Sequence, residues 1–174
     1  MAAWQTRGML GTNPDWIEAR ADVIENVPFA DLRVGMRARL VRRVTRETIE
    51  HFAESTGDFN PAHLDEDYAR ASRFGGIIAH GMWSGALISA VLGTLLPGPG
   101  TIYLEQTLKY LKPVRPGDVL SAEVTVAALD LERRRVELEC EVRNQDGDAV
   151  VSGVATVLAA RDKITRPRPL LQVI

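Results

Sequence analysis

The chain has 174 residues, of which 45% are hydrophobic and 25% are charged. This length corresponds to about one domain, at about 150 residues each, and suffices to bury a core without disulfides or metals. The composition excludes wholesale disorder, a coiled coil and a collagen-like chain. The net charge of −2 excludes a bulk attraction to nucleic acid or to an anionic membrane, and leaves open a local basic patch for an anionic ligand.

One cysteine, Cys140, is present in the whole sequence. It excludes an intramolecular disulfide framework and a cysteine-based zinc cluster, and it favours a cytoplasmic protein. The first residues lack the basic and apolar regions of a secretory signal, so we expect no cleaved leader. We interpret residues 1–28 as an N-terminal extension with a weak helical pattern around residues 17–24.

A strand and a short helix are predicted next. Arginines alternate with apolar residues over 36–44, as in a half-exposed strand. Thr45 is placed to cap the following helix, and Gly57 is placed to end it. Between them the apolar positions recur with helical spacing: Ile49, Phe52, Ala53 and Thr56. Because the residue before a proline disfavours the helical region, Asn60-Pro61 predicts an irregular loop over 57–63, followed by a short helix over 65–72.

The longest helix is expected over residues 79–96 and is closed by Pro97-Gly98-Pro99-Gly100. The run over 75–96 has His80 as its one ionisable residue and is long enough to cross a bilayer. Small residues recur every fourth position, namely Gly81, Gly85, Ser89 and Gly93. They also suit a buried helix that a sheet approaches closely, so we expect a buried helix and no membrane span.

After residue 100 the hydrophobic period changes from 3.6 to 2, which predicts strands with one buried face. The segments are 102–110, 120–128, 136–142 and 149–159, and turn-forming residues separate them. Gly153 permits a bulge or a close backbone approach in the last strand. We therefore predict an α+β domain over 29–160, with an antiparallel sheet around one buried helix, and a charged tail over 161–174.

The densest polar cluster lies at residues 55–67, where Asp58 and His63 are five positions apart across the predicted loop. A carboxylate and an imidazole that converge on one water could add it across a polarised double bond, and such acid–base help supplies about 10²- to 10⁴-fold. The alternative is that Asp58 caps a turn and His63 is a surface histidine. The spacing alone leaves both interpretations open.

A second cluster, His80-Gly81-Met82, begins the long helix. Free N–H groups at a helix N-terminus can stabilise a developing oxyanion, and Gly81 would allow a substrate to approach them. Alternatively, Gly81 is a packing glycine and His80 a core histidine. Ser84 and Ser89 could steady a carboxylate or bond to the preceding helical turn. The histidines and nearby aspartates lack the spacing of a known metal motif, so we expect no metal site.

Taken together, the two clusters resemble the MaoC-like (R)-specific enoyl-CoA hydratases. The matching run is Thr56-Gly57-Asp58-Phe59-Asn60-Pro61-Ala62-His63-Leu64-Asp65 with Ala69, followed by His80-Gly81-Met82. The sequence is also similar to the hydratase-like region that is fused to a phosphate acetyltransferase in some bacterial bifunctional enzymes. The resemblance implies a hotdog fold, in which an antiparallel sheet wraps around a long central helix with short overhanging helices.

The resemblance further implies reversible hydration of trans-2-enoyl-CoA to (3R)-3-hydroxyacyl-CoA without a metal or redox cofactor. Asp58 and His63 would activate water, and the Gly81 N–H would bind the thioester oxygen. The substrate would be a coenzyme A thioester or an acyl-carrier-protein thioester, and the protein would be a homodimer or a higher oligomer built from dimers. The remaining expected substrate contacts are Asn60, Ser89, His80, Met82, Trp83 and Tyr103.

Two other functions stay open at this point. A hotdog thioesterase would cleave the same class of substrate, and a non-catalytic module would bind acyl-CoA or a protein partner without turnover. Neither the acyl chain length nor the residue that meets the coenzyme A phosphates can be inferred; Arg70, Arg73 and Lys109 are candidates.

Overall fold

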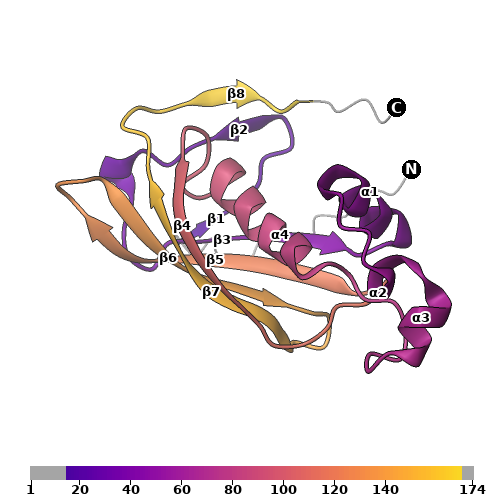
Figure 1. The fold of residues 1–174 in the computed structure, drawn as a ribbon. Coiled ribbons are helices and arrows are strands. Elements are labelled where there is room, and N and C mark those ends of the chain that lie inside the picture. Colours follow the sequence, from indigo (N-terminus) through magenta and orange to yellow (C-terminus); the bar gives the residue numbers. More distant parts are fainter. Residues whose placement is uncertain (1–14, 170–174) are drawn as a thin grey trace.

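A six-stranded sheet wraps around the long helix α4 (Gly81–Thr94) in the computed structural model, which describes residues 15–169 (Figure 1). The strand order is β1-β3-β5-β6-β7-β4, and every neighbouring pair is antiparallel except β1 and β3. The strands are β1 (Trp16–Ile17), β3 (Arg37–Arg43), β4 (Ile102–Tyr110), β5 (Val119–Asp130), β6 (Arg135–Arg143) and β7 (Ala149–Leu158).

The core lies between α4 and the inner face of the sheet. Alternate residues of β5 and β6 point inward and are buried, as their period of two predicts. They meet Ile88, Val91 and Leu92 of α4, which are fully buried. Because sheet and loops surround α4, the helix is apolar on most of its circumference. This arrangement is the hotdog fold, so the predicted α+β class is confirmed.

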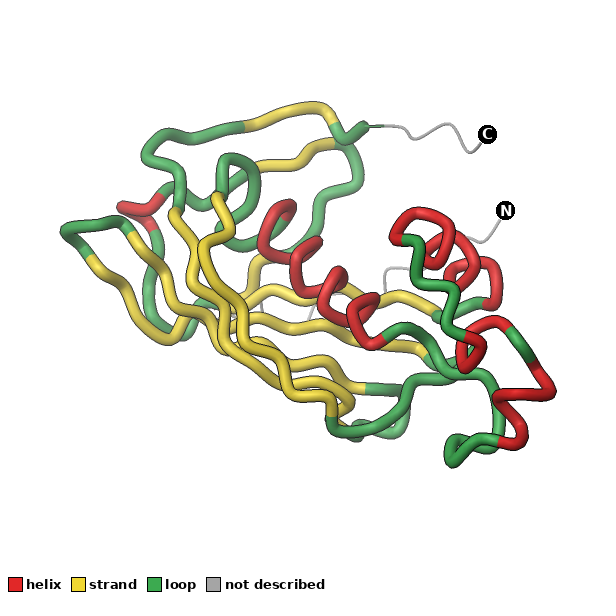
Figure 2. Tube along the Cα trace, in the orientation of Figure 1, coloured by secondary structure: helices red, strands yellow, loops and turns green. Residues whose placement is uncertain are grey.

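Three short helices cluster at the N-terminal end of α4 (Figure 2). They are α1 (Arg46–Thr56), α2 (Pro61–Leu64) and α3 (Glu66–Ala71). Thr45 caps α1 through a bond from the Thr48 N–H, and Gly57 ends it in the left-handed conformation, as predicted. The predicted irregular loop over 57–63 is partly wrong. Pro61 starts α2 and the Asn60 side chain caps it, so His63 lies on a helix.

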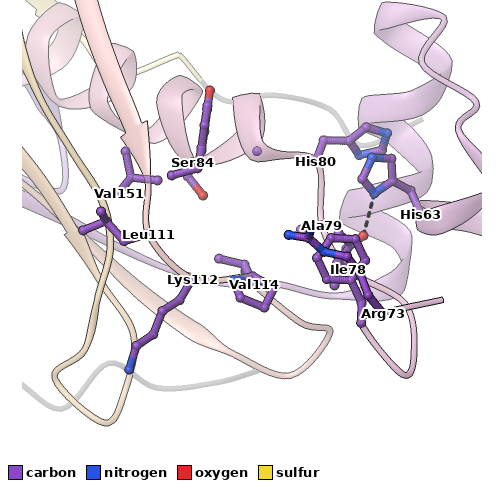
Figure 3. A pocket seen from close by; sticks show the side chains of 14 residues that line it. His63, Arg73, Ile78, Ala79, His80, Ser84, Leu111, Lys112, Val114 and Val151 are labelled. Carbon is purple, nitrogen blue, oxygen red and sulfur yellow. Dashed lines mark hydrogen bonds between the residues drawn. The ribbon is translucent and has the colours of Figure 1, made fainter. Parts of the chain in front are cut away.

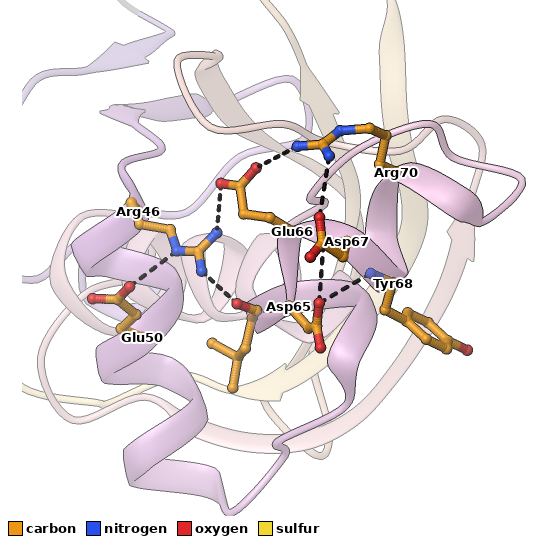
Figure 4. A network of polar contacts seen from close by, with 8 residues as sticks. Arg46, Glu50, Asp65, Glu66, Asp67, Tyr68 and Arg70 are labelled. Atoms are coloured by element: carbon orange, nitrogen blue, oxygen red, sulfur yellow. Dashed lines mark hydrogen bonds and ion pairs between the residues drawn. The ribbon is translucent and has the colours of Figure 1, made fainter.

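The guanidinium of Arg46 joins these short helices (Figure 4). Its Nη2 donates to the Leu64 carbonyl at 2.6 Å, and its other nitrogens pair with Glu50 at 3.0 Å and Glu66 at 3.6 Å. Arg70 pairs in turn with Glu66 and Asp67. The carbonyl that Arg46 holds belongs to the residue after His63, so this network fixes the helix that carries the predicted imidazole.

The helical pattern expected around residues 17–24 is wrong. The structure has a short 3-10 helix, η1 (Phe29–Asp31), preceded by β1 and by β2 (Val23–Glu25), which pairs with β8 (Thr165–Pro167) as a separate two-stranded sheet. The buried Asn26 joins the two ends: its Nδ2 donates to the Asp162 carbonyl and its Oδ1 accepts from the Ile164 N–H. The rest of the predicted extension and tail, 1–14 and 170–174, lies outside the described residues.

Strand β4 departs from the prediction of one buried face. Apolar residues on both of its faces are exposed, including Ile102, Leu104 and Tyr110. β4 is the last strand of the sheet and pairs only with β7 among residues 15–169. Where β7 passes β4, a Cβ on Gly153 would lie 1.8 Å from the Thr107 carbonyl oxygen, so the expected close approach is present. Across residues 15–169, no helix has the length and hydropathy to cross a membrane.

Candidate active site

The structure brings Asp58, His63 and His80 together at the N-terminal end of α4. One carboxylate oxygen of Asp58 and one ring nitrogen from each histidine lie within 4.8 Å of one another. Asp58 follows the left-handed Gly57 that ends α1, His63 lies on α2, and His80 is the N-cap residue of α4. Three separate elements therefore converge on one point, and His80 reaches it from 17 positions beyond His63.

The orientation of the His63 ring follows from one hydrogen bond. Its Nδ1 lies 2.8 Å from the Ile78 carbonyl oxygen. A carbonyl can only accept, so Nδ1 carries the proton and a neutral ring presents the lone pair of Nε2. His63 is buried, whereas Asp58 is exposed and its Oδ1 accepts from the Asn60 N–H at 3.3 Å. The pair thus combines a fixed imidazole with a carboxylate open to solvent.

The first turn of α4 supplies a backbone donor beside this pair. Gly81 is the first residue of α4, no side chain caps the helix, and within residues 15–169 its N–H has no hydrogen-bond partner. Such a free N–H at the positive end of the helix dipole is suited to an oxygen that gains negative charge. The absence of a side chain keeps this donor accessible.

A cavity of about 260 Å³ adjoins these groups (Figure 3). His63, His80 and Gly81 lie on its wall together with Ser84 and Arg73. The other lining residues are Phe74, Ile78, Ala79, Tyr110, Leu111, Lys112, Pro113, Val114 and Val151. The lining set holds two cations, Arg73 and Lys112, and no carboxylate, so Asp58 lies outside it. Lys112 pairs with Asp148 at 2.8 Å, which leaves Arg73 as the lining cation without a carboxylate partner among residues 15–169 and the candidate for an anionic ligand.

Several predicted substrate contacts lie outside this cavity wall. The Asn60 side chain accepts from the Ala62 N–H and is exposed, and Met82 is exposed with its sulfur accepting from the Tyr110 hydroxyl. Ser89 is exposed on α4, and Trp83 is half-buried against the core. Burial raises the pKa of Tyr103 to about 12, and its hydroxyl donates to Gln106. A role of these five residues in substrate binding stays a prediction.

Two of the lining residues, Ser84 and Arg73, were considered in the sequence without being assigned to the site. The Ser84 hydroxyl borders the cavity one helical turn after Gly81, and its helical spacing from Gly81 was the available signal. Arg73 was one of three residues considered for binding the coenzyme A phosphates, and the three differ in their position relative to the cavity. Arg70 pairs with two carboxylates away from the cavity, Lys109 is absent from its lining, and Arg73 lines it while stacking on Phe74 at 5.0 Å.

Asp58, His63 and His80 are also the group of described residues whose donor atoms could hold a metal ion. Each histidine already directs one ring nitrogen to a backbone carbonyl, Ile78 for His63 and Asp58 for His80. The Asp58 carboxylate and a ring nitrogen of His63 lie close enough to bind one water, because a water with partners about 2.8 Å away on each side spans about 4.5 Å at its tetrahedral angle. The geometry therefore supports a hydration site.

Comparison with known proteins gives a consistent result. The model of the MaoC like domain matches residues 31–156. A 3-hydroxybutyryl-CoA dehydratase of Methylorubrum extorquens is 45% identical, over 80% of this chain and 88% of that protein. An (R)-specific enoyl-CoA hydratase of Rhodospirillum rubrum is 46% identical, over 75% and 90%. The unliganded R-hydratase PhaJ1 from Pseudomonas aeruginosa has a TM-score of 0.83 at 43% identity, over 87% and 97%.

Proposed function

The chain belongs to the MaoC-like domain family, and from this we propose that it catalyses the reversible syn hydration of trans-2-enoyl-CoA to (3R)-3-hydroxyacyl-CoA. One observation carries the proposal: the Asp58 carboxylate and the His63 imidazole lie within bridging distance of one water, next to the free Gly81 N–H. Adding water to an enoyl thioester requires these three groups, a base, an acid and an oxyanion donor.

The reaction follows from the geometry. The thioester carbonyl oxygen accepts from the Gly81 N–H, which polarises the conjugated double bond. Asp58 and His63 hold the water; one of them takes a proton as the water oxygen bonds to C3, and the double-bond electrons move toward the carbonyl to give an enolate. The dyad then delivers a proton to C2 on the same face, which completes a syn addition. Every atom comes from water and the thioester and the addition is redox-neutral, so the reaction needs no redox cofactor.

The test is turnover of crotonyl-CoA, followed as loss of enoyl absorbance with chiral analysis of the product. Asp58→Asn and His63→Gln are each expected to lower kcat at least about 100-fold, since each removes half of the acid–base pair. Asp67→Asn is the matched control, because Asp67 is exposed on α3 and pairs with Arg70 away from the cavity. Release of free coenzyme A without hydration would favour a thioesterase, and wild-type turnover by Asp58→Asn would overturn the assigned role.

We also propose that the protein is a homodimer joined through β4. This nine-residue strand at the open edge of the sheet carries exposed apolar side chains, among them Ile102, Leu104 and Tyr110. Beside it, α4 exposes a strip of mostly small residues that includes Ala86 and Ser89. An open apolar strand edge tends to pair with another strand, and a two-fold axis would let β4 pair with β4 of a second copy.

Leu104→Glu tests the dimer, with Leu131→Glu as the control. Leu131 is 77% exposed in the turn between β5 and β6, far from the β4 edge in sequence and in the sheet order. Light scattering coupled to size exclusion should give a dimer for the wild type and for Leu131→Glu, and a monomer for Leu104→Glu. A wild-type monomer at working concentration would contradict the proposal.

Two coarser assignments accompany this function. We propose that residues 29–160 form the catalytic domain, flanked by the extension and the tail. The free thiol of Cys140, which is buried, fits a reducing cytoplasmic compartment. Parallel assays with crotonyl-CoA and a crotonyl acyl-carrier-protein thioester will identify the carrier that the enzyme prefers.

A further inference from the structure

We propose that His80 is a positioning residue that sets the relative placement of Asp58 and His63, rather than a group that contacts the substrate. This inference rests on the proposed hydratase function and adds a role that the dyad and the Gly81 amide do not cover. Three observations support it: a partly buried hydrogen bond to the Asp58 main chain, a ring stack on His63, and the lack of a nitrogen that is free to face the substrate.

The hydrogen bond ties the Asp58 loop to the body of the protein. His80 Nε2 lies 2.9 Å from the Asp58 carbonyl oxygen, so Nε2 carries a proton and donates it. The other hydrogen bonds at Asp58 are both 3.3 Å long and exposed, one from its N–H to Thr56 Oγ1 and one from the Asn60 N–H to its Oδ1. The imidazole therefore supplies the short, shielded contact that holds this loop.

The ring stack holds the other member of the dyad. The centroids of the His63 and His80 rings, which lie side by side in Figure 3, are 3.9 Å apart with an interplanar angle of 35°. Phe52 packs against His80 with its ring centroid at 5.0 Å. The stack limits the tilt of the His63 ring, while the bond from Nδ1 to the Ile78 carbonyl limits its rotation. A ring confined in both ways keeps its free Nε2 aimed in one direction.

The segment from Ile78 to Gly81 thus aligns all the reacting groups. The Ile78 carbonyl orients His63, the His80 ring holds the Asp58 main chain, and the Gly81 N–H faces the cavity. Four consecutive residues at the start of α4 therefore fix the base, the acid and the oxyanion donor relative to one another. Since a misplacement of about 1 Å can cost about 100-fold in rate, this alignment contributes directly to kcat.

Neither nitrogen of His80 is placed to act on the substrate. Nε2 is committed to the Asp58 carbonyl, and Nδ1 is buried without a hydrogen-bond partner among the residues that the structure describes. His80 is only 2% exposed, although it borders the cavity. It is therefore not a catalytic residue, and the predicted direct contact with substrate is replaced by a role through Asp58 and His63.

The experiment compares His80→Gln, His80→Asn and His80→Phe in crotonyl-CoA hydration. Glutamine places an N–H donor at about the position of Nε2, asparagine is polar but too short, and phenylalanine keeps a ring without a donor. We expect His80→Asn and His80→Phe to lower kcat at least about 10-fold with KM changed less than about two-fold, and His80→Gln to recover most of kcat. Thermal unfolding of each variant separates this effect from lost stability. If His80→Phe does not fold, the comparison of glutamine with asparagine is the test.

Histidine ¹⁵N NMR reports which ring nitrogen of each histidine carries the proton, a property that a purely structural role of His80 would leave unchanged. The wild type should show His63 with its proton on Nδ1 and His80 with its proton on Nε2. The His63 tautomer should persist in His80→Phe, which keeps a ring against His63, and should become mixed in His80→Asn, which removes that ring. Unchanged kcat in His80→Phe, equal losses in the glutamine and asparagine variants, or a rise confined to KM would each overturn the proposal. Failure of the wild type to hydrate crotonyl-CoA would instead overturn the proposed function, and the tautomers would still report on the contacts of His80.

Discussion

Gly81→Ala keeps the backbone N–H that we propose as the oxyanion donor and adds a methyl group beside it. A Cβ at Gly81 would lie 2.9 Å from Tyr110 Cε1, 3.1 Å from Cδ1 and 3.3 Å from Cζ. Ordinary carbon–carbon contacts begin near about 3.5 Å, so the tyrosine ring must move by about 0.5 Å or more. Gly81 and Tyr110 both line the cavity, so the added methyl group and the displaced ring narrow it beside the N–H.

The expected effect is larger on activity than on stability. Overpacking costs about 1–3 kcal/mol, and the gain in helix propensity from glycine to alanine returns about 0.5–1 kcal/mol. The free energy of unfolding should therefore fall by about 0–2.5 kcal/mol. Because catalytic groups must be held within about 0.5 Å, we expect kcat/KM for crotonyl-CoA to fall about 10- to 100-fold.

Gly85→Ala is the matched control, one helical turn further along α4. Its Cβ would also meet a carbon at 2.9 Å, but that carbon is the terminal methyl of Leu108, and neither residue lines the cavity. We expect kcat/KM to stay within about three-fold, since the flexible side chain can rotate away. Initial rates of crotonyl-CoA hydration and urea unfolding are measured for both variants. Equal losses of activity in both, or full activity in Gly81→Ala, would refute the reasoning.

Three further predictions concern other parts of the molecule. Arg73→Ala should raise KM for crotonyl-CoA about 5- to 10-fold and Arg70→Ala should not, because only Arg73 lines the cavity. Neither variant should change KM for crotonyl-pantetheine, which lacks the nucleotide phosphates. An equal rise in KM for both substrates in Arg73→Ala would contradict this assignment. Burial raises the pKa of the Cys140 thiol to about 11, so iodoacetamide should label this thiol near neutral pH only when urea unfolds the protein. Labelling is measured by mass spectrometry, and rapid labelling of the folded protein would argue against the burial of Cys140. The hydrogen bond from Lys163 lowers the pKa of Glu25 in the folded protein below its ordinary value of 4.5. The Lys163–Glu25 pair therefore stabilises the folded protein fully above pH 4.5, and this stabilisation is lost as the pH falls through the lowered pKa. The difference in free energy of unfolding between the wild type and Lys163→Met should therefore shrink in acid, measured by urea unfolding at several pH values. A difference that grows in acid would contradict the predicted pH dependence.

Local features of the sequence were predictable because neighbouring residues decide them. Thr45 and Gly57 mark the two ends of α1, and the alternation after residue 100 defines the sheet strands, since caps and burial period act within a few positions. The run from Asp58 to His63 likewise contained the proposed acid–base pair, whose side chains lie close together in the structure.

Long-range pairing was not predictable in this way. β2 and β8 are short and join residues about 140 positions apart, and neither has a hydrophobic period long enough to detect. The alternation of β4 correctly indicated a strand, but which faces are covered depends on what lies beside the sheet edge.

The amino-acid sequence by itself thus determined α1, α3, α4 and most of the strands, and it suggested the proposed acid–base pair. Only the tertiary structure decided that Ser84 and Arg73 line the cavity, that β4 is an open edge, and that His80 faces the Asp58 carbonyl, 22 positions away. The physical reason is that hydrogen bonds and packing between distant segments depend on where the folded backbone brings them, and no local pattern records that position.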